Sequence, residues 1–157
     1  MSSRRSPKAR SQSSSRSAAR SSAPGGVPSG AGGPCPCGLP GTYEGCCGRF
    51  HAGPAGAPTA EALMRSRYSA FVVRDEAYLL RTWHPRTRPG RVDFDPGLRW
   101  TGLEILGTSE GSAFHTTGTV TFRASFRGGA LHERSRFERV DGAWVYVDGE
   151  FPEQGPS

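Results

Sequence analysis

All four cysteines of this 157-residue chain lie between positions 35 and 47. They form the stretch CPCGLPGTYEGCC, in which a C-x-C pair and an adjacent C-C pair are separated by eight residues. The stretch has too few large apolar side chains to build a hydrophobic core, so another interaction must hold it in one conformation. Two pairs of thiols provide the four ligands of a tetrahedral ion, and this predicts a segment organised by a metal.

The expected metal is Zn²⁺, bound by Cys35, Cys37, Cys46 and Cys47 in a closed structural site. The N-terminus lacks the apolar stretch of a secretory signal, so we expect a cytoplasmic protein with reduced thiols. The alternatives are a disulfide pair, a redox centre or an iron–sulfur cluster, although adjacent cysteines bridge only with strain and C-x-x-C is absent. His51, four residues after Cys47, is an alternative fourth ligand.

The positive charge of the chain is concentrated in its first 20 residues. Lys and Arg number 20 against 14 Asp and Glu, and the net charge is +6. No acidic residue precedes Glu44, and the basic and acidic residues cancel after position 20. The Ser/Arg-rich and then Gly/Pro-rich composition of residues 1–33 predicts a disordered arm, either a solvated extension or a weak contact to RNA or the ribosome. Residues 152–157 are expected to be a disordered tail, and no apolar run is long enough to span a membrane.

Two helices are predicted after a short linker. Residues 59–73 have a helical period, with Thr59 as the N-cap. The apolar stripe of this first helix consists of Met64, Tyr68, Phe71 and Val72, with Leu63 beside it. Asp75 is the expected N-cap of a second helix over residues 76–84, which Pro85 must end. The two helices are expected to pack as a hairpin with one buried face.

From residue 98 onward the period changes to two, which predicts strands. The alternation over residues 98–106 shifts its parity at Gly102, as at a β-bulge, and residues 118–127 alternate apolar with polar side chains. Two-residue hairpin turns are expected at 128–129 and 141–142. The fold class is therefore α+β, with the helices covering one face of a curved antiparallel sheet of at least four strands.

The predicted turns also indicate which residues share the helix-facing side of the sheet. Ala124 then opposes Glu133, and Ser135 opposes Asp148, with Tyr146 on the same face. A three-residue turn would invert these faces. Two interpretations stay open: the carboxylates reach solvent or hydrogen-bond to nearby arginines, or they form the polar floor of a pocket with general acid or base chemistry.

A pocket of this kind would draw its lining from both helices and strands. The candidates are His84, Trp83, Trp100, Glu133, Tyr146 and Asp148. His84 has a structural interpretation as well, since a residue at a helix end often completes the C-terminal hydrogen bonds. Arg65 or Arg67 on the first helix is expected to form a buried or half-buried ion pair with Glu133 or Asp148. Arg123, Arg134 and Arg136 are expected to make a basic strip on the outer face.

Several motifs resemble known sequences. CPCG and CCG, with Tyr43 between them, resemble the SEC-C zinc motif, which in the SecA translocation ATPase serves partner binding. The stretches MRSRYSAFV, DEAYLLRTWHP, RWTGLEIL, HERSRF and YVDGE, in this order, resemble the YchJ-like uncharacterised protein family over nearly all of residues 34–151. The resemblance implies a SEC-C zinc motif at 34–52, with the four cysteines as ligands, followed by a nuclear-transport-factor-2-like cone at 58–151.

Binding is the activity that the sequence favours over catalysis. A site whose four ligands all come from the protein leaves no position for a substrate. We therefore expect the zinc motif to be a structural platform for a protein partner, such as a component of the translation or export machinery, with the cone as its scaffold. The alternative is an enzyme or small-molecule-binding protein that acts through the cone pocket.

Overall fold

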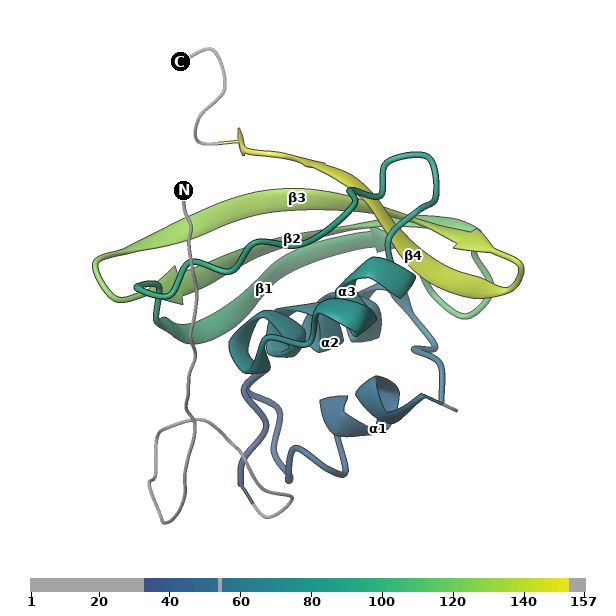
Figure 1. Ribbon diagram of the computed structural model, residues 1–157. Coiled ribbons are helices and arrows are strands. Elements are labelled where there is room, and N and C mark those ends of the chain that lie inside the picture. The colour runs from purple at the N-terminus through teal and green to yellow at the C-terminus, as the bar shows by residue number, and fades with distance from the viewer. Residues whose placement is uncertain (1–32, 54, 153–157) are drawn as a thin grey trace.

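Helix α2 (Ala60–Val73) lies across one face of a four-stranded antiparallel sheet, and α1 (Cys47–Ala52) lies on the other side of α2 (Figure 1). This arrangement is seen in a computed structural model that describes residues 33–53 and 55–152. The predicted N-terminal arm up to residue 32, and most of the predicted tail, lie outside the described residues. The helices and the sheet form an α+β fold, which confirms the predicted class.

Both predicted helix starts are confirmed. The Oγ1 atom of Thr59 accepts a hydrogen bond of 3.0 Å from the backbone N–H of Ala62 at the start of α2. Asp75 caps α3 (Glu76–Arg81) in the same way, through a 3.0 Å bond from the N–H of Tyr78. These side chains satisfy backbone donors that have no partner inside the helix.

The second helix ends three residues earlier than predicted, at Arg81. The residues after it run beside β4 (Ala143–Glu150), where Tyr146 donates its N–H to Thr82 O and His84 donates its N–H to Tyr146 O, both at 2.8 Å. These two bonds replace the last helical turn. They also place Trp83 directly against Tyr146, with ring centroids 5.3 Å apart.

The sheet is a meander in the order β1-β2-β3-β4. Its first three strands are β1 (Trp100–Glu110), β2 (Thr117–Phe126) and β3 (Gly129–Val140). The pairing of β1 with β2 shifts between Trp100 and Gly102, which confirms the predicted bulge, and shifts again between Ile105 and Gly107. Bulges of this kind bend a strand, and the bend curves the sheet around α2.

The predicted pairing of β2 with β3 is wrong by two residues. Phe126 pairs with Gly129, so the tight turn is made by Arg127 and Gly128 instead of by residues 128–129. Gly128 has a φ of 101°, a conformation that glycine adopts without steric cost. Because the shift is two residues, each side chain keeps its predicted face, and Glu133 lies opposite Phe122 instead of Ala124.

The predicted position of Asp148 is also wrong. Phe137 pairs with Tyr146 as expected, but the register shifts at this point and Arg136 pairs with Asp148. The extra residue in β4 turns Asp148 to the outer face of the sheet, where its carboxylate binds the guanidinium of Arg136 at 2.6 and 2.7 Å. Ser135 pairs with Gly149, not with Asp148.

The outer face carries ion pairs where a basic strip was expected. Arg123 lies 3.4 Å from Glu104, Arg134 lies 3.0 Å from Glu150, and Arg136 pairs with Asp148. Each of the three arginines thus has a carboxylate on a neighbouring strand. Such exposed pairs contribute only about 0–1 kcal/mol each, but they neutralise the strip.

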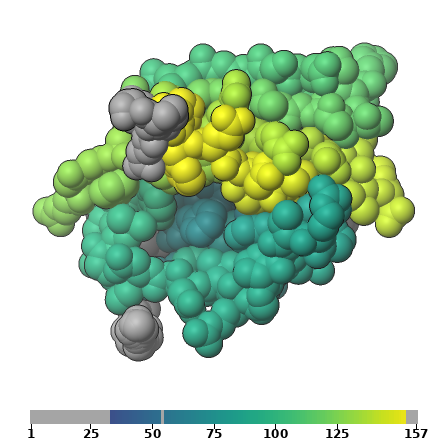
Figure 2. All heavy atoms as spheres, turned by 90° about the horizontal axis from the view of Figure 1, so that it is seen from above, coloured from purple at the N-terminus to yellow at the C-terminus, as the bar shows by residue number. Residues whose placement is uncertain are grey.

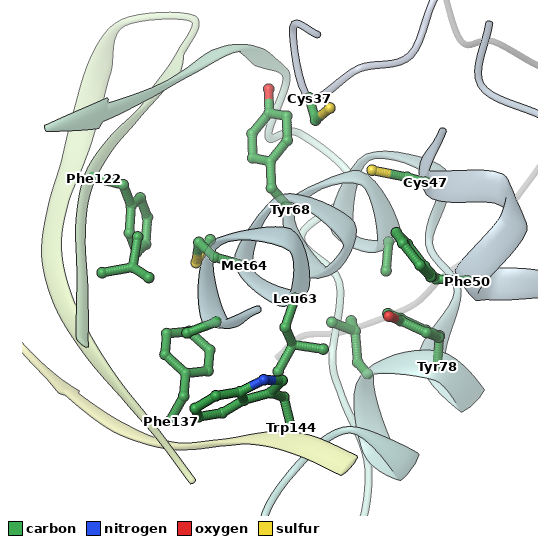
Figure 3. Packing of buried hydrophobic residues seen from close by; sticks show 14 of the residues in the cluster. Cys37, Cys47, Phe50, Leu63, Met64, Tyr68, Tyr78, Phe122, Phe137 and Trp144 are labelled. Atoms are coloured by element: carbon green, nitrogen blue, oxygen red, sulfur yellow. The ribbon is translucent and has the colours of Figure 1, made fainter. Parts of the chain in front are cut away.

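One hydrophobic core joins the cysteine motif, defined here as residues 33–53, to the cone formed by α2, α3 and the sheet. Leu63 of α2 and Phe137 of β3 are each 1% exposed, and Cys37 and Cys47 belong to the same buried cluster. Figure 3 shows the sulfurs of these two cysteines close together at one side of α2, with Leu63 and Trp144 on another. Each fully buried large apolar side chain contributes about 1.5–3 kcal/mol.

Among residues 33–53 and 55–152, no helix has both the length and the apolar character needed to cross a bilayer.

We predict that Gly118→Ala destabilises the fold, because a Cβ on Gly118 would lie 2.4 Å from the Cα of Gly111. The expected loss is about 1–3 kcal/mol of unfolding free energy. Gly107→Ala is the matched control in β1, since a Cβ there meets nothing within 4 Å and should be neutral or slightly stabilising. Urea unfolding of both variants measures the difference, and equal free energies would contradict this packing.

Candidate functional site

The four cysteine sulfurs come together at the N-terminal end of the described chain. The cysteines are free thiols, and their Sγ atoms all lie within 4.8 Å of one another. Cys35, Cys37 and Cys47 are buried, and Cys46 is half-buried. Cys47 is the first residue of α1, and Cys46 is its N-cap, so the helix start fixes the direction of both side chains.

The geometry of the cluster fits a tetrahedral metal ion. Four thiolates at about 2.3 Å from a zinc ion are about 3.8 Å apart. The Sγ atoms of Cys37 and Cys46 are 3.7 Å apart. A set of four sulfur donors also excludes hard cations such as Mg²⁺ and Ca²⁺, which prefer oxygen ligands. The residues present therefore fit a soft or borderline divalent metal.

The thiols need a cation in order to be ionised together. Burial raises the pKa of the Cys46 thiol to about 11. Hydrogen bonds with the thiols of Cys37 and Cys47 lower the pKa of Cys35, and the bonds to Cys35 raise the pKa of Cys47 in return. The cluster therefore favours one thiolate at the expense of its neighbours. A divalent ion would remove this conflict, because Cys35, Cys37, Cys46 and Cys47 would all bind it as thiolates.

The cysteine motif is docked on α2 and α3 by polar contacts. The Sγ atom of Cys35 lies 3.6 Å from Ser69 Oγ. Arg65 donates from Nη1 to Cys37 O at 2.8 Å, and Arg81 donates from Nη2 to Phe50 O at 2.9 Å. The two predicted units, 34–52 and 58–151, are therefore in direct contact and share one core.

His51 connects the motif to the cone. Its Nε2 lies 2.8 Å from the carbonyl oxygen of Ser66, which can only accept, so Nε2 carries the proton. Its Nδ1 accepts a 2.5 Å hydrogen bond from the hydroxyl of Tyr43. Burial lowers the pKa of His51, which keeps the ring neutral. Both ring nitrogens have protein partners, so the structure does not show the alternative in which His51 replaces Cys47 as a ligand.

A pocket of about 210 Å³ lies between α2 and the helix-facing side of the sheet. Its walls are mainly aromatic and apolar: Met64, Tyr68, Phe71, Trp83, Trp100 and Phe122, with Ala124 and Leu131. Figure 2 shows a hollow in the surface between yellow β4 and the teal segment that follows α3, with blue atoms of the earlier chain at its bottom. Three residues of the apolar stripe predicted for the first helix, Met64, Tyr68 and Phe71, thus form one wall of this pocket.

Arg67 brings a buried positive charge to the pocket. Its side chain is 4% exposed, and Nη1 donates to Leu79 O at 2.9 Å and to Thr82 Oγ1 at 2.8 Å. The guanidinium lies over the rings of Trp83 and Tyr146, at 4.8 and 4.7 Å from their centroids. Burial lowers the pKa of Arg67 to about 10, so it is charged at neutral pH. These contacts replace the ion pair predicted for Arg67, and Arg65 pairs with Glu61 at 3.0 Å instead of with a carboxylate of the sheet.

Glu133 brings a buried carboxylate to the same pocket. It is 8% exposed, and its Oε2 accepts hydrogen bonds from Ser135 Oγ at 2.8 Å and from Tyr146 OH at 2.9 Å. Burial raises the pKa of Tyr146, so the phenol donates in this bond. Gly149 makes room for the carboxylate, because a Cβ there would lie 1.9 Å from Oε2. Tyr146 therefore connects the two charged groups: the guanidinium of Arg67 lies over its ring, and its hydroxyl donates to the carboxylate of Glu133.

The structure sorts the predicted pocket residues into two groups. Trp83, Trp100, Glu133 and Tyr146 line the pocket, together with Ser135. His84 does not belong to the lining; its Nε2 lies 3.4 Å from Glu138 Oε1 and its Nδ1 accepts from the N–H of Arg86. Asp148 lies on the outer face.

Sequence reasoning missed three features of the cysteine cluster and the pocket. It predicted a buried face for the helix stripe without naming Met64 or Tyr68 as pocket residues, whereas both line the cavity. It gave no role to Ser69, which faces Cys35, although a serine in an apolar helix is a signal of a polar contact. The need for Gly149 beside Glu133 could not be seen without the register of β3 and β4.

Comparisons with known proteins agree with this architecture. A family model described as the YchJ middle NTF2-like domain matches residues 59–149. A UPF0225 protein of Streptomyces coelicolor is 80% identical over 118 residues, which cover 75% of this chain and 95% of that protein. A UPF0225 protein of Corynebacterium glutamicum is 51% identical over 74% of this chain and 95% of the relative.

Two solved structures have the same fold. The solution structure of a SEC-C motif-containing protein from Rhodopseudomonas palustris is similar with a TM-score of 0.64 and 38% identity, over 74% of this chain and 96% of that one. The crystal structure of a SEC-C motif-containing protein from Psychrobacter arcticus has a TM-score of 0.61 and 29% identity, over 73% and 80%. The cysteine cluster, the sheet and the sequence matches lead to one conclusion: the chain belongs to the UPF0225 family and contains the YchJ-type NTF2-like domain.

Proposed function

We propose that this protein binds a small molecule in the cone pocket and that a zinc ion in the cysteine cluster has a structural role. The pocket is the observation that carries the proposal. Its volume is about 210 Å³, its walls are mainly aromatic, and the buried residues Arg67 and Glu133 line it. Concave apolar sites with a few convergent polar groups are the usual form of a ligand site. Buried charges of this kind are costly to a fold unless they are used or well paired.

Zinc is the metal that best suits the cluster. The four thiols lie within 4.8 Å of one another, and four thiolates are a usual ligand set of structural zinc sites. All four positions come from the chain, so a bound ion would have no open position for a substrate. Its contribution would be to hold residues 33–53 in the conformation that packs on α2.

We predict that the unchanged protein binds one zinc ion per chain and that the Cys37→Ser variant loses it. Cys37 is fully buried and would supply one of the four ligands. His51→Gln is the matched control: it removes the bonds to Tyr43 and Ser66 but leaves the four sulfurs. Metal analysis of the three purified proteins checks this, and thermal unfolding reports stability. Zinc retained in Cys37→Ser but lost in His51→Gln would mean that the ligand set is wrong. Acid should release the metal, because protons compete for the thiolates.

We predict that benzyl alcohol, a neutral molecule slightly larger than benzene, binds in the pocket and changes the fluorescence of Trp83 and Trp100, which line it. Ala124→Leu should weaken this binding about tenfold or more, because the added side chain occupies the cavity. Ser125→Leu adds the same side chain at the neighbouring position of β2, on the other face, and should bind as the unchanged protein does. Native mass spectrometry of the purified protein tests independently for a retained small molecule. No fluorescence change, or equal binding by both variants, would contradict a ligand pocket.

Protein docking through the cysteine motif is a second candidate function. The loop between the two cysteine pairs exposes Leu39, which is 42% exposed beside a cluster in which three of the four cysteines are buried. We predict that Leu39→Ser reduces capture of a partner from cell extract while zinc content stays unchanged. Leu106→Ser is the control, since Leu106 is 41% exposed on β1, outside the motif. Equal recovery of a partner by the two variants would contradict docking at this loop.

Two further expectations concern the basic N-terminal arm and the location of the protein in the cell. Contact with RNA or the ribosome is predicted for the basic arm. The arm up to position 32 lies outside the described residues. This contact remains a proposal, as does a cytoplasmic location.

A further inference from the structure

We propose that the pocket selects a neutral, planar ring compound that carries both a hydrogen-bond acceptor and an adjacent N–H donor, such as a carboxamide or a lactam. The inference rests on the proposed ligand-binding function and names the class of ligand. It follows from three observations: the volume of the cavity, the unused hydrogen-bonding atoms of its two charged residues, and the balance of their charges.

The cavity volume limits the ligand to a single ring with a short substituent. A cavity of about 150 Å³ is large enough to bind benzene. At about 210 Å³, this pocket holds a six-membered ring and a group of about three heavy atoms. Trp83, Trp100 and Phe122 offer flat aromatic surfaces on the wall, which favours a planar body that stacks against a ring.

The two charged residues present complementary atoms. Within the described part of the chain, the hydrogen bonds of Arg67 all start from Nη1, which is tied to Leu79 and Thr82. Those of Glu133 all end on Oε2. Because both side chains line the pocket, the remaining guanidinium N–H groups are donors for a ligand, and Oε1 is an acceptor.

Charge balance excludes a strongly charged ligand. Arg67 and Glu133 face the same cavity, and the carboxylate favours the charged form of the guanidinium. Their charges sum to zero. A carboxylate ligand would bring a second anion near Glu133, and an ammonium or amidinium ligand would bring a second cation near Arg67. A neutral group that accepts from Arg67 and donates to Glu133 satisfies both without adding charge.

Four ring compounds of nearly equal size test this class: benzamide, benzoate, benzamidine and ethylbenzene. Their affinities are measured by tryptophan fluorescence and checked by calorimetry. The unchanged protein should bind benzamide about tenfold or more tighter than each of the other three, because only benzamide satisfies both buried charges.

Glu133→Gln provides the decisive variant, since it removes the anion and leaves Arg67 uncompensated. Its preference should move from benzamide to benzoate, a change that a general loss of stability would not produce. Glu133→Asp, which keeps the charge, should retain the order of the unchanged protein. Circular dichroism confirms that each variant is folded.

The outcomes separate the ligand class from the binding function. If benzoate, benzamidine or ethylbenzene binds the unchanged protein as tightly as benzamide or more tightly, the class is wrong and the ligand pocket stands. If Glu133→Gln keeps the benzamide preference, Glu133 does not set the selectivity and the inference is overturned. If none of the four compounds binds, the proposed function fails together with the class.

Discussion

The whole structure depends on the position of α2 between the cysteine motif and the sheet. One side of this helix carries Ser69, which faces Cys35, and the carbonyl of Ser66, which accepts from His51. Another side carries Arg67 and Tyr68, which line the pocket. A single helix therefore holds the cysteine cluster in place and forms a wall of the pocket. Any change that moves α2 alters both.

The cysteine motif is consequently part of the core and not an appendage. Cys37, Cys47 and Phe50 are buried in the cluster that also contains Leu63 and Phe137. The sequence of the motif has too few apolar residues for a core of its own, as its composition indicates. The structure supplies that core from α2 and α3. In this arrangement, a bound metal would stabilise the contact surface between the motif and the cone.

The sequence predicted the fold class and four of the pocket residues, but not every strand register or the surroundings of Arg67. Periodicity and capping residues such as Thr59 and Asp75 predicted the helix starts and the meander, because these signals are local.

The bulge at Arg136 and Phe137 was missed, since it depends on how β4 accommodates an extra residue, and Asp148 was therefore placed on the wrong face. Glu133 was placed on the correct face because an error of two residues in register preserves the alternation. The surroundings of Arg67 could not be predicted, since Trp83, Thr82 and Tyr146 meet there only after the chain leaves α3.

The most direct test of the account is hydrogen–deuterium exchange of the purified protein before and after treatment with a zinc chelator. The shared core predicts that residues 33–53 and α2 lose protection together, while strands β2 and β3, paired with each other along their length, stay protected. Exchange that increases only within residues 33–53, with α2 fully protected, would show that the motif and the cone are independent and would contradict the account.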